Sequence, residues 1–174
     1  MLLLAALPIL KELKGLPSQL ANPKFMHHLL GPFLFWGLLI GVIAWMLSLW
    51  VVKNRTAQVC SLLLIAVSSF SLFPFLSYRK KAAPITAPSA LRLNEQNDRY
   101  KDLQWVFYSI GGLAILGIFL TGEKKGPLAT VLTFTIATGG LAAALAALYL
   151  QEKEISVFHE DARLAPPVAK SGRL

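Results

Sequence analysis

The chain has 174 residues, of which 55% are hydrophobic and only 15% are charged, and its mean hydropathy is +0.58. A soluble domain of this size needs a more charged surface, so this composition excludes an ordinary soluble protein. The formal net charge is +8, but the basic residues flank the apolar runs, which indicates anionic lipid headgroups as partners and not nucleic acid.

The segment 1–30 precedes the first long apolar run. Its start, "MLLLAALPIL", lacks the basic beginning and the small-residue cleavage site of a signal peptide. Leu3, Leu7 and Leu10 recur at helical spacing, and Lys11 can reach the headgroups. This pattern predicts a helix that lies in the membrane interface.

Four uncharged runs follow, each close to the roughly 20 residues that a helix needs to cross a hydrocarbon layer. We predict a four-helix transmembrane domain over 31–150, with spans at 31–52, 56–78, 103–121 and 127–150, a loop at 79–102 and a C-terminal tail at 151–174. Spans one and two, and spans three and four, are joined by connections so short that each pair must be antiparallel neighbours. The predicted fold is an all-α integral membrane protein, a bundle of two antiparallel hairpins with an N-terminal interfacial helix.

The long middle loop carries two prolines. Pro84 and Pro88 are expected to prevent a regular helix over its first half, whereas "SALRLNEQNDRYKD" can form a short surface helix that leads into the third span. The loop is either a simple connection or a docking surface for a partner.

The distribution of lysine and arginine predicts the orientation of the chain. The two tails and the middle loop share one side and hold thirteen of the seventeen basic residues. Because such residues are retained preferentially in the cytoplasm, both termini are predicted to be cytoplasmic.

Small residues at four-residue spacing predict close contacts between helices. Gly37 and Gly41 lie on the first span, and Gly139, Ala143 and Ala147 lie on the fourth. Such rows allow helix backbones to approach each other closely inside a bilayer.

The interiors of the predicted spans contain no Asp, Glu, Lys, Arg or His. Proton relays, ion sites and many substrate sites are built from such groups, so a pump or an ion-coupled transporter is disfavoured. Cys60 is the only cysteine, and no motif for zinc, an iron–sulfur cluster or covalent haem is present. We therefore expect no enzymatic activity and no metal site.

The three histidines, His27, His28 and His159, are predicted to lie on one side of the membrane. Imidazole can hold a b-type haem or the magnesium of a chlorophyll-type pigment, and ligands on the first and fourth helices can hold such a group between them. Alternatively, His27 and His28 are polar anchors at the headgroup level beside aromatic residues. Contact with a quinone is a third open role.

The segment "NPKFMHHLLGPFLF" resembles the beginning of a widespread bacterial family of four-span membrane domains of unknown function. The first helix of that family starts with a pattern close to His-Pro-x-x-Val-His-Phe-Pro. Pro23, Met26 and His27 take the places of the proline, the valine and the second histidine, while Asn22 replaces the first histidine and the Phe-Pro pair is missing. The resemblance implies four spans in two hairpins and an association with redox chemistry.

These patterns predict a non-catalytic accessory subunit of a larger energy-converting complex, respiratory or photosynthetic, in a bacterial inner or photosynthetic membrane. Such a subunit packs on other membrane subunits and on lipids, and a chlorophyll-type pigment or haem b is its candidate cofactor. The alternative is a small b-type cytochrome or quinone-reactive protein that uses His27, His28 and His159. A transporter or channel is less consistent with the sequence, which supplies no polar stripe to line a path.

Overall fold

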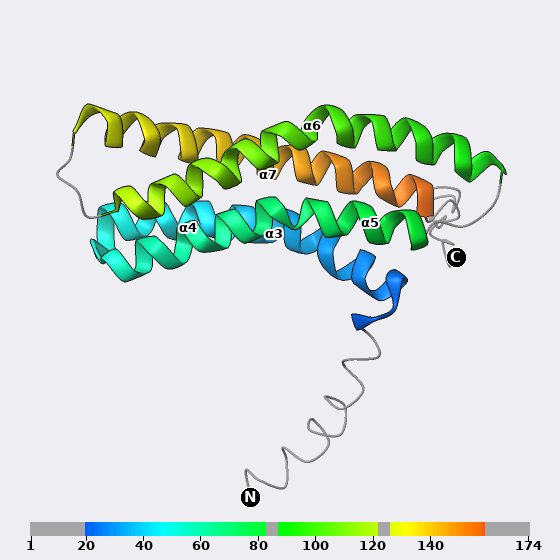
Figure 1. Ribbon diagram of the computed structural model, residues 1–174, viewed down its shortest axis with the longest axis horizontal. Helices are drawn as coiled ribbons and strands as arrows, with labels where there is room; N and C mark the ends of the chain where they lie inside the picture. Colours follow the sequence, from blue (N-terminus) through cyan, green and yellow to red (C-terminus); the bar gives the residue numbers. More distant parts are fainter. Residues whose placement is uncertain (1–19, 83–86, 122–125, 159–174) are drawn as a thin grey trace, which may run out of the picture.

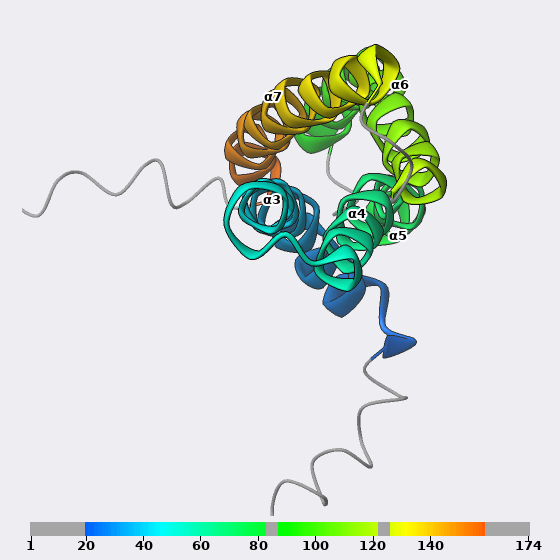
Figure 2. The same ribbon diagram turned by 90° about the vertical axis from the view of Figure 1, so that its left-hand side faces the viewer.

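The computed structural model describes residues 20–82, 87–121 and 126–158, although not the side chains of 87–93 and 155–158. Over these residues the chain is helical, with no strand. The helices lie side by side along one direction (Figure 1) and form a ring when viewed along the bundle (Figure 2). The elements are α3 (Pro23–Leu47), the π-helical turn η1 (Ser48–Val52), α4 (Arg55–Phe70), α5 (Leu72–Ala82), α6 (Ala87–Leu120) and α7 (Pro127–Phe158).

Each long helix packs on two neighbours. Helix α3 contacts α4 and α5 on one side and α7 on the other, and α6 closes the ring between α4 and α7. Within the described residues, four segments are long and apolar enough to cross a membrane: Pro23–Val52, Arg55–Ala82, Asn94–Leu120 and Pro127–Glu154. The all-helical prediction with four long apolar helices is therefore confirmed.

Asparagine side chains fix where α3 and α4 begin. Asn22 Oδ1 accepts a hydrogen bond from the backbone N–H of Lys24 at 3.0 Å, and Asn54 Oδ1 accepts one from the N–H of Thr56 at 2.8 Å. Each bond satisfies an N–H that has no partner within the first helical turn. Between the two helices, Lys53 has a left-handed backbone with φ 50°, which reverses the chain within two residues.

The segment 79–102 is more helical than predicted: the helix expected over "SALRLNEQNDRYKD" is present, as the first part of a longer helix. Helix α5 continues to Ala82, and α6 is already helical from Ala87, sixteen residues before the predicted third span. Pro88 does not prevent this, because it occupies the first turn of α6, where a backbone N–H has no helical acceptor. The predicted N-terminal interfacial helix, at 1–19, lies outside the described residues.

Helical structure also extends beyond both ends of the predicted domain. Helix α3 starts at Pro23 instead of residue 31, and α7 runs to Phe158, well into the segment expected to be a tail. The additional turns place polar and charged residues inside the bundle at the end where α3 begins and α7 ends.

Small residues bring α3 against α4 and α7 against α3 and α6. A Cβ atom added to Gly37 would lie 3.0 Å from Ser68 Cβ, and one added to Gly41 would lie 2.8 Å from Ile65 Cγ1. A Cβ atom on Gly139 would lie 2.4 Å from Ile110 Cδ1. Ala143 and Ala147 are buried as well. The residues in these rows thus lie at helix–helix contacts.

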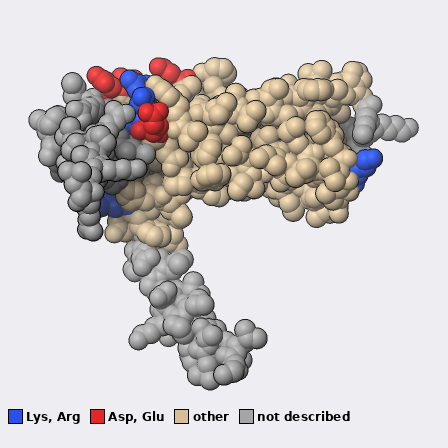
Figure 3. Space-filling model, turned by 180° about the vertical axis from the view of Figure 1, so that it is seen from behind, with Lys and Arg blue, Asp and Glu red and all other residues tan. Residues whose placement is uncertain are grey.

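The outer surface is apolar over the middle of the bundle. Large hydrophobic side chains are exposed on all the long helices, among them Trp36, Phe73, Phe119 and Phe134. In Figure 3 the charged side chains gather at the two ends of the bundle, and the surface between them is free of charge on the face shown. A soluble protein would not leave such a surface uncovered.

Replacing Gly41 by alanine is expected to destabilise the bundle by about 1–3 kcal/mol, because the new methyl group would press on Ile65 at the α3–α4 contact. Gly112→Ala is the matched control: nothing lies within 4 Å of a Cβ at Gly112, so this change is expected to be neutral or to stabilise by about 0.5–1 kcal/mol. Thermal unfolding of the purified variants in mild detergent checks both values. Equal effects of the two substitutions would contradict the close contact.

Candidate functional site

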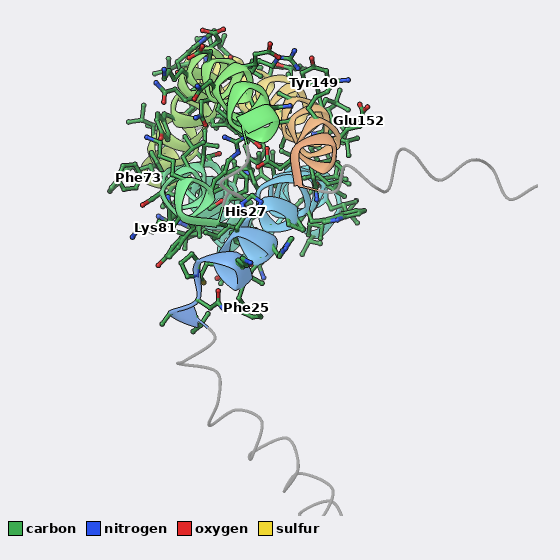
Figure 4. All side chains as sticks on the ribbon, turned by 90° about the vertical axis from the view of Figure 1, so that its right-hand side faces the viewer. Phe25, His27, Phe73, Lys81, Tyr149 and Glu152 are labelled. Atoms are coloured by element: carbon green, nitrogen blue, oxygen red, sulfur yellow. The ribbon has the colours of Figure 1, made fainter. Side chains whose placement is uncertain are left out.

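A cluster of polar side chains is buried at the end of the bundle where α3 begins and α7 ends. We call it the end cluster; it consists of His27 from α3, Arg79 from α5, Asn97 and Tyr100 from α6, and Glu154 from α7. The exposed fractions of His27, Arg79, Tyr100 and Glu154 are 5%, 0%, 2% and 7%. Figure 4 looks onto this end, where His27 lies inside the ring of helices while Phe25, Phe73 and Tyr149 lie at its rim.

Arg79 is the centre of the cluster. Its Nε donates a hydrogen bond to Glu154 Oε1 at 2.5 Å, and its Nη1 donates one to Asn97 Oδ1. The guanidinium carbon lies 5.1 Å from the centroid of the Tyr100 ring, a distance typical of cation–π contacts. One arginine therefore links three helices.

Glu154 is approached by three other helices. Besides Arg79, the hydroxyl of Tyr100 donates to Oε2 at 3.5 Å, and His27 Nε2 lies 3.6 Å from Oε1. The negative charge of the carboxylate is thus matched by the guanidinium and shared with two further polar groups. A buried carboxylate requires such compensation, since its desolvation is otherwise very costly.

Aromatic rings surround the inner side of the cluster. The imidazole of His27 stacks on Phe75 with centroids 5.1 Å apart and an interplanar angle of 24°. Phe75 also contacts Tyr100 at 5.5 Å, and His28 lies 5.5 Å from His27. These contacts hold the His27 ring in the bundle interior.

Helical periodicity explains why the charged residues point inward. On α5, Arg79 follows the buried residues Leu72 and Phe75 at spacings of seven and four. On α7, Glu154 follows the buried Ala147 at a spacing of seven. Residues three, four and seven positions apart share one helix face, so each charge continues the inward face of its helix.

A pocket lies beside the end cluster, between α3 and α7. Its volume is about 110 Å³, and its walls include His27, His28 and Gly31 from α3 and Gln151 and Glu154 from α7. Phe75 and Tyr100 complete it from α5 and α6. The pocket thus combines buried polar atoms with aromatic surface.

The structure separates the three histidines that the sequence grouped together. His27 is buried, so it is not an anchor that faces lipid headgroups, whereas its neighbour His28 is exposed. His159 lies outside the described residues. Among the described residues, no group of three His, Cys, Asp or Glu side chains is arranged to hold a metal ion.

The sequence patterns did not predict Arg79, Asn97, Tyr100 and Glu154 as a set. Arg79 was expected in the loop at 79–102 and Glu154 in the C-terminal tail, whereas α5 and α7 continue through these positions. One signal was available in the sequence. Arg79 and Glu154 each lie on the apolar face of their helix, about one turn beyond the end of its apolar run. That these two residues pair with each other is visible only in the structure, where α5 and α7 bring them together.

The comparisons with known protein families, with curated proteins and with solved structures find no match for this chain. The resemblance carried by "NPKFMHHLLGPFLF" therefore stays a prediction. In the structure, Asn22 and Pro23 of that segment cap and start α3.

Glu154→Gln is expected to destabilise the protein by about 3–5 kcal/mol, since it leaves the fully buried Arg79 without a countercharge. The control is Asp98→Asn, which breaks the exposed pair between Lys101 and Asp98 and should cost less than about 1 kcal/mol. Thermal or denaturant unfolding in detergent measures both.

The double variant Arg79→Met with Glu154→Gln tests the same pairing. Removing both charges should restore part of the stability lost in Glu154→Gln, as is observed when buried ion pairs are replaced together. Additive losses in the double variant would show that the two residues do not stabilise each other.

Proposed function

We propose that this chain is an integral membrane protein with four spans, and that it is a non-catalytic accessory subunit of a larger energy-converting membrane complex. The observation that carries the proposal is the outer surface: the four long helices expose large apolar side chains along their length, and charges gather at the bundle ends. Such a surface suits lipid and the apolar faces of neighbouring membrane subunits.

The interior supports a structural role over a transport role. The middle of the bundle is filled by fully buried side chains such as Leu38, Ile65, Phe107 and Ile136, and small residues bring the backbones together there. The buried serines on α4 include Ser61, whose hydroxyl bonds the carbonyl of Ala57 one turn back. Within the described residues, this packing provides no polar path along the bundle axis.

The haem-binding alternative has weaker support. The pocket beside His27 is about 110 Å³, far smaller than a porphyrin, and the imidazole of His27 is packed against Phe75 and directed towards Glu154. A haem would have to displace these contacts. The same holds for a chlorophyll-type pigment, whose macrocycle is equally large.

Co-purification tests the accessory role. After gentle detergent extraction of native membranes, the chain is expected to migrate with a large complex that contains other membrane subunits, as seen by size fractionation and mass spectrometry of each fraction. Migration as a small colourless species would contradict the proposal. A small species with a haem Soret band, lost in His27→Ala, would favour the cytochrome alternative instead.

Cysteine labelling tests the orientation. Cys60 is the only cysteine, so a Cys60→Ser background gives a clean host for single cysteines at Asn54 and at Glu152, which lie at opposite ends of the bundle. With both termini cytoplasmic, a membrane-impermeant maleimide added to intact spheroplasts should label the Asn54→Cys variant and not the Glu152→Cys variant until the cells are opened. The reverse pattern would invert the proposed topology.

A further inference from the structure

The pocket between α3 and α7 has the dimensions of a single ring. Its volume of about 110 Å³ is of the same order as the engineered protein cavity of about 150 Å³ that binds benzene. Gly31 contributes to this space because it has no side chain. A Cβ atom added there would contact only Phe75 Cε2, at 3.4 Å. The space therefore suits a six-membered ring.

The pocket changes in polarity along the helices. Towards the charged end of the bundle it is lined by His28 and Gln151, which are exposed and half-buried, and by Glu154. One to two turns further into the bundle it is lined by Leu34 and Ala147, which are buried and apolar. A ring with a polar group at the mouth and an apolar edge on the inner side matches this order.

The charge of the pocket favours a neutral head. The described lining contains no lysine or arginine, so it offers no charge partner to a phosphate or a carboxylate. The one carboxylate in the lining, Glu154, already pairs with Arg79 and accepts from Tyr100, which disfavours a cationic head as well. The remaining attractive groups are the amide of Gln151, which can donate a hydrogen bond, and the aromatic rings of Phe75 and Tyr100.

We propose that this pocket binds the headgroup of a membrane quinone: a neutral six-membered ring with one carbonyl oxygen at the mouth, where it accepts a hydrogen bond from the amide of Gln151, and with an apolar edge against Leu34 and Ala147. The ring packs against the aromatic wall formed by Phe75 and Tyr100, in the way that aromatic pairs favour. The inference rests on the proposed membrane insertion, since such ligands are dissolved in lipid, and it does not require the accessory role. It is a binding proposal, with no electron transfer assigned to this chain.

The test is a titration of the purified full chain, reconstituted in zwitterionic nanodiscs, with a benzoquinone that carries a ten-carbon tail. Calorimetry is expected to show saturable binding of one ligand per chain, and decyl phosphate, which has the same tail and an anionic head, is expected not to compete. No saturable binding to the reconstituted chain, or equal binding of decyl phosphate, would overturn the proposal. Flotation of the nanodiscs shows separately whether the chain has inserted, so failure of insertion is distinguished from failure of binding.

Variants locate the ligand. Gly31→Leu places a side chain inside the pocket and is expected to weaken binding by at least about tenfold, equivalent to roughly 1.4 kcal/mol. Gly112→Leu is the matched control, because Gly112 faces open space, and its affinity should stay within about twofold of the unmodified chain. Unchanged binding in Gly31→Leu would overturn the assignment.

If Gly31→Leu does not fold, the Gln151→Leu variant tests whether the headgroup lies in this pocket. It removes a donor at the half-buried mouth and is expected to weaken quinone binding by about two- to tenfold, the effect of one lost hydrogen bond. An affinity for the quinone equal to that of the unmodified chain would show that the headgroup does not lie in this pocket.

Discussion

The ion pair between Arg79 and Glu154 sets how the helices meet at one end of the bundle. Neither charge is tolerable in the interior alone, because the effective desolvation penalty is several kcal/mol per ion. Arg79 is fully buried and bonds Glu154 at 2.5 Å. This contact requires α5 and α7 to continue beyond their apolar runs, and the bonds of Asn97 and Tyr100 bring α6 to the same point. The position of His27, and therefore of the pocket, follows from this arrangement.

Two kinds of packing divide the bundle along its length. In the middle, Gly37, Gly41 and Gly139 allow close approach, and dispersion contacts between apolar side chains fill the space. In the end cluster, a shift of one helix along another by one turn, about 5.4 Å, would separate Arg79 from Glu154. Hydrogen-bonded charges thus specify register where the small residues supply proximity.

The sequence was sufficient to predict the four long apolar helices and the small-residue rows, since both depend on local composition and spacing. It was not sufficient to predict where the helices end. Pro88 and the charges at 92–102 suggested a loop, yet proline is compatible with the first turn of α6, and one face of that helix carries Tyr100 into the core. The end cluster could not be derived from local patterns, because Arg79 and Glu154 are 75 residues apart and only the ring of helices brings them together. His27 was singled out for its residue type, but its burial depends on Phe75 from another helix.

The proposed ligand and the end cluster depend on each other physically. His27 and Glu154 belong to both, so whatever occupies the pocket touches the same side chains that align α3 with α7. A ligand that binds only this arrangement stabilises it by a free energy that grows with the logarithm of its concentration relative to its dissociation constant. The aligned helices in turn preserve the ring-sized space, since its walls lie on the four helices that the end cluster joins. An accessory subunit with such a site would hold its conformation most firmly where the lipid-soluble ligand is abundant, which links its packing in an assembly to the composition of the membrane around it.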